Sequence, residues 1–376
     1  MRIVCAPDSF KESMTALQAA QAMADGVHRV APDAFCDLVP MADGGEGTVQ
    51  ALIDGLGGVL VDAPCHDALG RPIVAAYGYV ASQRLAIIEM AAASGLELIR
   101  PQDRDIAVAS SFGTGELVLD ALNRGASRFI VGIGGSATND AGAGMCQALG
   151  VRFLDADGAT LPAGGAALAR LAFVDQRGLD PRLAQCHLEI ACDVTNPLLG
   201  PNGASAIFGP QKGANKKHLI ADLDAALTQW SDVVEVATRQ NVRHIPGAGA
   251  AGGLGAAFAA FFPVAVLRRG VEIVIDAVHL RDRIADADWV FTGEGSIDVQ
   301  TLAGKTPWGV AQLAKRAGVP VVMFGGRISD DARQLLESDV TTLVPIVPAG
   351  QPLAEALANA QANLADAAQA FCRTLL

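Results

Sequence analysis

The chain has 376 residues, of which 51% are hydrophobic and only 5% aromatic, and its formal net charge is −12. This hydrophobic fraction supports a large folded core, whereas the acidic balance, with no run of basic residues, argues against binding to nucleic acid or to a membrane surface. Seven scattered cysteines without a CxxC pair are typical of a reduced, cytoplasmic protein.

The first sixty residues predict a strand, a helix, a strand and a helix, from the spacing of their apolar residues. The expected elements are Arg2–Ala6, Met14–Val30, Cys36–Pro40 and Gly47–Leu56. Ser13 is a candidate N-cap for the first helix, and Ser9-x-x-Glu12 matches the pattern of a capping box.

The last ninety residues alternate in the same way. The expected strands are Trp289–Thr292, Val319–Phe324 and Thr342–Val347, and the expected helices are Pro307–Ala317, Asp330–Glu337 and Pro352–Leu376. Five short apolar strands joined by helices predict a doubly wound, parallel α/β domain. This domain would consist of residues 1–61 and 284–376.

Residues 62–283 then form a second, inserted α/β domain whose strand order the sequence does not give. Its expected strands are Ala86–Met90, Phe129–Ile133, Val151–Leu154, His187–Cys192 and Glu272–Ile275, and its expected helices are Gly115–Asn123 and His218–Gln240. The stretch 245–267 has no charged residue, but it is rich in Gly and Ala and contains two prolines. We therefore expect a glycine-rich loop and a buried helix there, and no membrane span.

Polar residues follow the strands, at the edge where parallel sheets bind their ligands. They lie in PDSFKES (7–13), MADGGEGT (41–48), GEGSIDVQTLAGKT (293–306), GGSATND (134–140) and 193–196. Glycine turns and lysines suit phosphate oxygens, and carboxylates suit Mg²⁺ or accept a hydroxyl proton. These loops predict a phosphorylated ligand with a metal ion, although each loop taken alone could be a simple turn.

The stretch FIVGIGGSATNDAGAG (129–144) also contains G-x-G-x-x-A, the pattern of a dinucleotide-binding turn. The strand-like VRFLD that follows would place Asp155 about twenty residues further on, where a ribose-binding acid belongs. An NAD-dependent dehydrogenase is therefore an alternative. Against it, Asp140 would lie in the first helical turn, where its carboxylate would repel a pyrophosphate.

Several blocks of the chain resemble the class I glycerate kinases of bacteria, in the same order and over nearly the whole length. They are APDSFKES (6–13), PMADGGEGT (40–48), VGIGGSATNDAGAGM (131–145), ACDVTNPLLGPNGAS (191–205), GPQKGA (209–214), GAGAAGGLG (247–255) and TGEGSIDVQTLAGKTPWGVA (292–311). The family pattern sometimes has Gly where this chain has Glu12, a change that we expect to be harmless at a helix start.

The resemblance implies ATP-dependent phosphorylation of D-glycerate with Mg²⁺. It also implies a flavodoxin-like domain interrupted by a second α/β domain, with the active site in the cleft between them. In enzymes of this kind that serve glyoxylate or glucarate catabolism, the product is usually 2-phospho-D-glycerate. A 3-phosphoglycerate-forming kinase is the alternative, and a non-catalytic effector-binding protein with the same fold is a further one. A chain this rich in glycine and alanine can also form a homodimer.

Roles for individual residues follow as hypotheses. The residues expected to bind the nucleotide or the transferring phosphate are Gly134, Gly135, Ser136, Thr138 and Asn139. The catalytic candidates are Asp193 as general base, Asp298 as second choice for it, and Lys11 and Lys305 as charge-neutralising groups. The substrate-binding candidates are Ser9, Arg71 and Asn196, and the metal-binding candidates are Asp43, Glu46 and Glu294.

Overall fold

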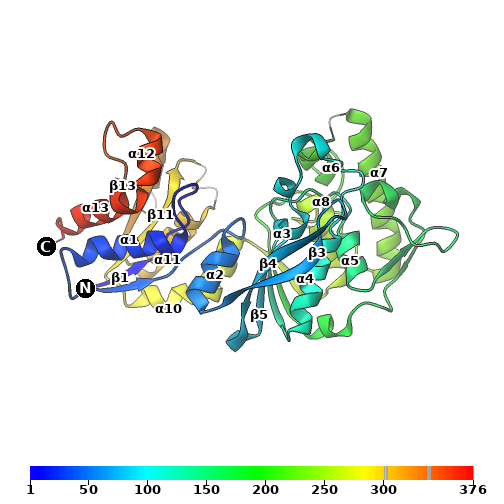
Figure 1. Ribbon diagram of the computed structural model, residues 1–376, viewed down its shortest axis with the longest axis horizontal. Helices are drawn as coiled ribbons and strands as arrows, with labels where there is room; N and C mark the ends of the chain where they lie inside the picture. The colour runs from blue at the N-terminus through cyan, green and yellow to red at the C-terminus, as the bar shows by residue number, and fades with distance from the viewer. Residues whose placement is uncertain (215, 300, 302–303, 337–339, 376) are drawn as a thin grey trace. The chain divides into compact units, whose positions relative to one another are not determined.

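The computed structural model describes residues 1–214, 216–299, 301, 304–336 and 340–375, so Gln300 of the polar loop 293–306 and the expected helix end at Glu337 lie outside it. The chain forms two compact units (Figure 1). The first contains Met1–Asp43, Gln50–Gly58 and Val271–Leu376, and the second contains Gly44–Val49 and Val59–Gly270.

The second boundary therefore lies near residue 270, whereas the sequence suggested 283. The stretch expected as a strand at 272–275 belongs instead to helix α9 (Gly270–Ala277), so that expectation was wrong. Its two exposed residues, Glu272 and Asp276, are four positions apart and so share one helix face, a pattern that the short apolar run VEIVI conceals.

The first unit contains a parallel sheet with the strand order β13-β12-β11-β1-β2. Its strands are β1 (Arg2–Cys5), β2 (Phe35–Leu38), β11 (Trp289–Ile297), β12 (Val321–Ile328) and β13 (Thr342–Pro345). Counted along the chain as one to five, they stand in the flavodoxin-like order 2-1-3-4-5. The predicted doubly wound domain, interrupted by an insertion, is confirmed.

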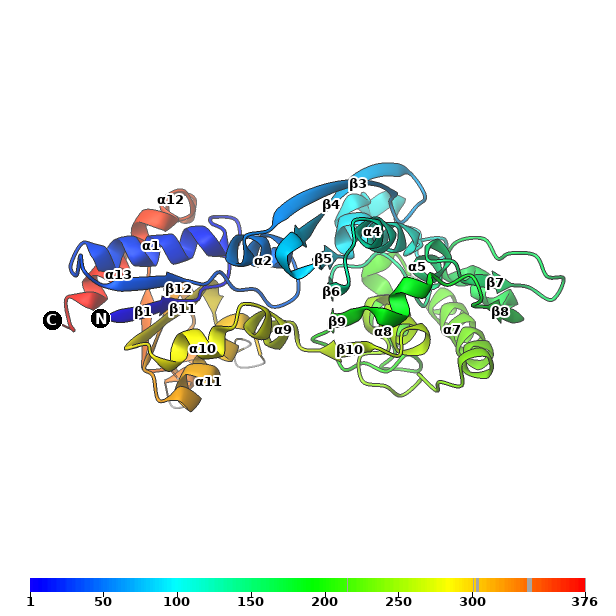
Figure 2. The same ribbon diagram turned by 90° about the horizontal axis from the view of Figure 1, so that it is seen from below.

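Helices cover both faces of this sheet, with α1 and α13 on one side and α10 and α11 on the other (Figure 2). The helices of the unit are α1 (Ala16–His28), α2 (Thr48–Leu56), α9, α10 (Leu280–Ala285), α11 (Thr306–Ala317), η8 (Asp330–Leu335, a 3₁₀ helix), α12 (Leu353–Ala358) and α13 (Ala360–Cys372). The first residues of α2 and α9 belong to the second unit. The single long helix expected at 352–376 is thus two helices. At Gly26, where α1 crosses α13, a Cβ atom would lie 2.2 Å from the Ala365 carbonyl oxygen.

The segment before α1 differs from the expected helix start. The N-cap is Thr15, whose hydroxyl accepts a hydrogen bond from the Gln18 N–H, while the Gln18 side chain accepts one from the Thr15 N–H. Neither Ser13 nor the Ser9-x-x-Glu12 pattern caps the helix. Residues 10–14 instead form a tight turn in which Glu12 has φ = +63°, in the left-handed region. Because L-residues are strained there, Glu12 is not a harmless replacement for glycine.

The second unit is built on a six-stranded sheet with the order β10-β9-β6-β5-β4-β3. Its strands are β3 (Val59–His66), β4 (Pro72–Val80), β5 (Leu85–Glu89), β6 (Arg128–Gly132), β9 (His187–Ala191) and β10 (Ala265–Arg268). The strands β5, β6, β9 and β10 run parallel, and the hairpin β3–β4 adds an antiparallel edge. The sequence analysis missed this hairpin and β10.

The remaining elements of the second unit surround this sheet. They are α3 (Ala91–Ser94), α4 (Phe112–Asn123), α5 (Ala143–Ala148), α6 (Ala204–Phe208), α7 (Lys217–Thr238), α8 (Ala250–Phe261), the hairpin β7 (Arg152–Leu154) with β8 (Phe173–Asp175), and the 3₁₀ helices η1 (Ala81–Gln83), η2 (Leu96–Leu98), η3 (Pro101–Asp103), η4 (Gly165–Arg170), η5 (Pro181–Gln185) and η6 (Pro210–Lys212). The uncharged stretch forms α8 and β10, and none of the helices in the described ranges is both long and apolar enough to cross a membrane.

Candidate active site

Three carboxylates gather at the carboxyl edge of the first unit's sheet. Asp8 follows β1, Asp43 follows β2, and Glu294 lies on β11, the other neighbour of β1. Burial raises the pKa of Asp8 to about 7, and the nearby charges of Asp43 and Glu294 contribute to the rise. In a flavodoxin-like sheet the point between β1 and β11 is where the strand order reverses, and ligands bind there.

Glu294 is held by two of its neighbours in this cluster. Its carboxylate accepts a hydrogen bond of 2.9 Å from the Thr301 hydroxyl and lies 3.4 Å from Lys305 Nζ. Burial raises the pKa of Glu294, Lys305 opposes the rise, and the charge of Asp298 adds to it. The structure thus brings together Glu294, Asp298 and Lys305, three of the residues expected from the sequence.

Ser9 and Lys11 belong to the loop that follows β1 in the same unit. The backbone N–H of Ser9 donates to the Asp8 carboxylate at 2.6 Å, while the Lys11 side chain is exposed. A Cβ atom at Gly295 would lie 3.4 Å from the Lys11 backbone nitrogen, so this loop packs directly against β11. The loop therefore brings Asp8, which the sequence analysis had not assigned a role, beside Glu294.

The expected metal ligands come from both units. Asp43 and Glu294 belong to the first, and Glu46 belongs to the second. Within the described ranges, no group of three or more His, Cys, Asp or Glu residues is placed to hold a metal ion. Mg²⁺ in phosphotransferases, however, needs only one or two carboxylates together with substrate phosphates. The crowded carboxylates beside Asp8, whose mutual repulsion a cation would relieve, have the donor chemistry for that arrangement.

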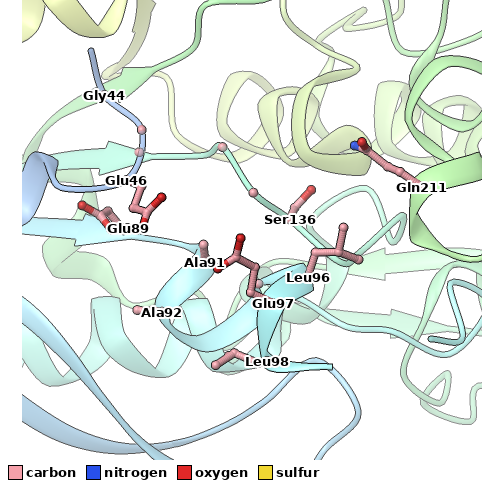
Figure 3. A pocket seen from close by; sticks show the side chains of 15 residues that line it. Gly44, Glu46, Glu89, Ala91, Ala92, Leu96, Glu97, Leu98, Ser136 and Gln211 are labelled. Carbon is pink, nitrogen blue, oxygen red and sulfur yellow. The ribbon is translucent and has the colours of Figure 1, made fainter. Parts of the chain in front are cut away.

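The second unit contains a pocket of about 550 Å³ (Figure 3). One wall is the glycine turn after β6, from Gly134 to Ser136, and another is the η2 segment, Leu96–Leu98. Glu46 and Glu89 stand side by side on one side of the pocket, and Gln211 enters from another. Apolar surface from Ala91, Leu96 and Leu98 beside a polar turn suits a ligand with one flat apolar part and one anionic part.

The glycine turn has the backbone features of an anion-binding site. Gly135 has φ = +72°, its carbonyl accepts from the Leu96 N–H at 2.8 Å, and the Ala137 N–H donates to the Ser94 carbonyl at 2.9 Å. The N–H groups of Gly134, Gly135 and Ser136 have no hydrogen-bond acceptor in the described part of the chain. Consecutive unpaired N–H groups lining a pocket form a cradle for phosphate or carboxylate oxygens.

The second half of the expected phosphate-binding stretch points into the protein interior. Thr138 and Asn139 are both fully buried. The Thr138 hydroxyl donates to the Ala251 carbonyl at 3.5 Å, and the Asn139 amide nitrogen donates to the Ser205 hydroxyl at 3.0 Å. These two side chains connect the turn to α8 and α6 and do not line the pocket.

The dinucleotide-binding interpretation of this turn is wrong. The helix after the turn, α5, begins only at Ala143, so no helix N-terminus lies at the glycines. The strand expected to carry the ribose-binding acid is β7, which pairs with β8 in a separate two-stranded sheet. Asp155 lies in the turn after β7, where it accepts hydrogen bonds from the N–H groups of Asp157 and Ala159.

The pocket carboxylates have different surroundings. Glu89 accepts a 3.0 Å hydrogen bond from the Val49 N–H in the first turn of α2, so it acts as a helix cap supplied by β5. Burial raises its pKa, and backbone N–H groups at the start of α2 oppose the rise. Glu46 and Glu97 are exposed and line the same pocket. Sequence analysis had singled out only Glu46 of these three.

Asp193 follows β9, the strand that pairs with β6, and the glycine turn follows β6. Gly132 of β6 pairs with Ala191 of β9, and Gly134 and Asp193 each follow two residues later. Asp193 is exposed, and its carboxylate accepts a 3.1 Å hydrogen bond from the Gly270 N–H, the first residue of α9. It therefore caps a helix and is also accessible to a ligand.

Asn196 and Arg71, expected to bind substrate, both make structural contacts. Asn196 donates to the Asn202 carbonyl at 2.9 Å and so closes its own loop. The Arg71 Nε lies 2.5 Å from the buried Asp67 carboxylate, and its guanidinium also donates to the Leu98 carbonyl at 3.3 Å. Neither side chain lines the pocket.

Sequence analysis missed one buried cation at the turn, Lys212. It lies in the block GPQKGA, which was noted as a unit without a role for its lysine. Its Nζ donates to the Ser136 hydroxyl, and burial lowers its pKa to about 7. The only signal in the sequence was a lone lysine between glycines, in a chain with few basic residues.

Comparison with known proteins gives a consistent result. The model of the glycerate kinase family matches residues 3–376. The chain is 46% identical over 375 residues to a glycerate kinase of Haemophilus influenzae, covering 100% of this chain and 99% of that protein. It is 47% identical to glycerate 2-kinase of Escherichia coli, with 100% and 98% coverage. A crystal structure of a protein assigned as glycerate kinase 2, from Salmonella typhimurium LT2, matches with a TM-score of 0.92 and 48% identity, covering 100% of this chain and 98% of that one.

Proposed function

The chain belongs to the glycerate kinase family of phosphotransferases, and we propose that it transfers the terminal phosphoryl group of ATP to D-glycerate, forming 2-phospho-D-glycerate. The name of the Escherichia coli relative, glycerate 2-kinase, supports the 2-hydroxyl as the acceptor. Transfer to the 3-hydroxyl is the alternative. We place the reaction in organic-acid catabolism of the glyoxylate or glucarate type, in the cytoplasm, where ATP is supplied and the seven unpaired cysteines would stay reduced.

The observation that carries this proposal is the glycine turn of the second unit. Its three unpaired N–H groups and the Ser136 hydroxyl line a pocket that also offers apolar walls at Leu96 and Leu98. We propose that this pocket holds the nucleotide, with its phosphates on Gly134, Gly135 and Ser136. Thr138 and Asn139 would then hold the turn in shape from behind, since their side chains face α8 and α6.

We propose that Asp193 accepts the proton of the attacking hydroxyl. The carboxylate is exposed, and it follows β9, which pairs with the strand β6 that leads into the glycine turn. Its hydrogen bond from the Gly270 N–H keeps it oriented. Asp298 remains the second candidate.

We propose that the first unit contributes charge control through the residues around Glu294. Mg²⁺, when bound with the nucleotide, would neutralise phosphate charge during transfer. Asp8, Asp43 and Glu294 are the carboxylates of this unit that would hold it, and Glu46 is the candidate in the second unit. Lys305 and Lys11 would neutralise the carboxylate of D-glycerate or the phosphoryl oxygens, and Ser9 would donate a hydrogen bond to them.

The experiment that tests the proposed function is a coupled ADP-release assay with ATP, Mg²⁺ and D-glycerate, followed by phosphorus NMR of the product. We expect ADP release that depends on D-glycerate, and a phosphorus signal coupled to one proton, the one on C2. Coupling to two protons would identify the 3-phosphate instead. ADP release that is the same with and without D-glycerate would contradict the proposal.

A further inference from the structure

Lys212 lies buried directly behind the pocket-lining turn. It is the last residue of η6, it follows the pocket residue Gln211, and its side chain is only 2% exposed. Nζ donates to Ser136 Oγ and to the Thr138 carbonyl oxygen, both at 2.7 Å. No carboxylate in the described part of the chain forms an ion pair with it. A buried ammonium without an ion-pair partner is costly, so a protein that keeps one usually needs it for function.

When Lys212 is charged, its hydrogen bond with Ser136 has a fixed direction. An ammonium group can only donate, so Ser136 Oγ must be the acceptor in this contact. The hydroxyl hydrogen of Ser136 is then left to donate elsewhere, and the described residues provide no acceptor for it. Because Ser136 lines the pocket, this donor is available to a ligand that binds there (Figure 3).

We propose that Lys212 is the positioning cation of a phosphate site: it holds the Gly134–Thr138 turn from behind and fixes the Ser136 hydroxyl as a donor to a phosphate group in the pocket. This inference rests on the proposed function, because it assigns the phosphate to the nucleotide or to the phosphorylated product. Lys212 acts through Ser136 and through the shape of the turn, and it needs no direct contact with the reacting atoms.

The charges of the pocket explain why such a cation is needed. Glu46, Glu89 and Glu97 line it, and these carboxylates repel an anionic ligand. The N–H groups of the turn supply only partial positive charge. Burial lowers the pKa of Lys212. The carboxylate of Asp140, which follows the glycine turn in the chain, opposes that effect. A bound phosphate would act in the same direction as Asp140 and favour the charged lysine.

The test is ligand binding, measured by calorimetry with ADP and, in a separate arm, with 2-phosphoglycerate. The main variant is Lys212→Met, which keeps an unbranched apolar side chain of nearly the same length and removes the charge. Lys217→Met, an exposed lysine at the start of α7, is the matched control. For the ligand whose phosphate occupies the turn, we expect Lys212→Met to bind about 10- to 100-fold more weakly than the native protein. This is the loss expected when a charge-assisted hydrogen bond is removed. The control should bind with the native affinity.

A second variant keeps the proposal testable if Lys212→Met does not fold. Ser136→Ala removes only one hydroxyl, and we expect it to weaken the same ligand about three- to tenfold. If Lys212 acts through Ser136, the effect of the double variant is smaller than the product of the two single effects. Independent, multiplicative effects would contradict the proposed route through Ser136.

A merely structural lysine would give a different pattern. It would lower the melting temperature of the ligand-free protein while leaving both binding constants within about threefold of the native values, and that result would overturn the proposal. The arm that responds identifies the source of the phosphate, nucleotide or product. Because binding is measured without turnover, absence of glycerate-dependent ADP release would count against the proposed function and not against the role of Lys212.

Discussion

Asp140 and Ser111 form a buried pair that joins the glycine turn to α4. The Asp140 Oδ2 accepts hydrogen bonds from the Ser111 N–H at 2.8 Å and from the Ser111 hydroxyl at 2.9 Å. The Gly144 N–H donates to the same oxygen, and the Gly142 N–H donates to Oδ1, each at 3.1 Å. The carboxylate that argued against a pyrophosphate at this position is therefore a structural group that organises the start of α5.

We expect Asp140→Asn to destabilise the protein by about 2–3 kcal/mol. Both carboxylate oxygens accept hydrogen bonds from backbone N–H groups, so the amide nitrogen of asparagine would replace an acceptor with a second donor. Urea unfolding of the ligand-free protein measures the change. Asp155→Asn is the control, since Asp155 accepts its two hydrogen bonds in an exposed turn, and we expect less than about 1 kcal/mol for it. Equal losses in the two variants would contradict the role assigned to the Asp140 network.

Glu12→Gly should stabilise the protein. Glu12 has φ = +63°, and a left-handed L-residue carries a strain of about 1–2 kcal/mol that glycine avoids, although glycine loses more chain entropy on folding. We expect a net gain of up to about 1 kcal/mol in the free energy of unfolding. Glu235→Gly, in the last turn of α7, is the same substitution in a helical residue and should cost about 1 kcal/mol. A loss of stability at both positions would mean that the turn at Glu12 is not strained.

Asp193→Asn separates the structural role of this side chain, as a cap of α9, from its proposed catalytic role as a general base. The asparagine oxygen can still accept from the Gly270 N–H, so α9 keeps its cap and the melting temperature should change little. Loss of a general base typically lowers kcat about 10²- to 10⁴-fold, and we expect a decrease of that size in the ADP-release assay. Asp155→Asn should leave kcat unchanged. A decrease in kcat of less than about tenfold would exclude Asp193 and leave Asp298 as the candidate to test next.

Lys212 should make the stability of the protein depend on pH. Its pKa is lowered to about 7 in the folded state by burial, whereas an unfolded lysine keeps a pKa near 10.4. Between these values the unfolded chain binds more protons than the folded one, so the free energy of unfolding contributed by this group rises with pH from about 7 to 10.

The slope of the free energy of unfolding against pH should approach about 1.4 kcal/mol per pH unit, the value for a difference of one bound proton between the two states. Subtracting the stability–pH profile of Lys212→Met from that of the native protein isolates the contribution of Lys212 from those of other groups that titrate in this range. A difference profile that is flat between pH 7 and 9.5 would show that Lys212 keeps its normal pKa in the folded protein.

The motifs of the sequence located the regions of the site better than they assigned roles within it. The loops after β1, β2 and β11 do meet at one sheet edge, and the turn at Gly134 does line a pocket. Within the turn, however, Thr138 and Asn139 face the interior, because the direction of each side chain depends on the backbone path and on neighbours from α6 and α8. Lys212 escaped notice for the same reason, since its partner Ser136 is distant in sequence.

The sequence by itself determined the parallel sheet of the first unit and its interruption, because alternating apolar strands and amphipathic helices are local patterns that short-range physics enforces. It also determined the family, through blocks that occur in a fixed order. Only the tertiary structure decided that 271–277 is a helix, that Glu12 lies in a strained turn and that Asp140 is a buried network acceptor. These features depend on contacts between residues far apart in the chain, whose burial and hydrogen-bond partners exist only after the chain has folded.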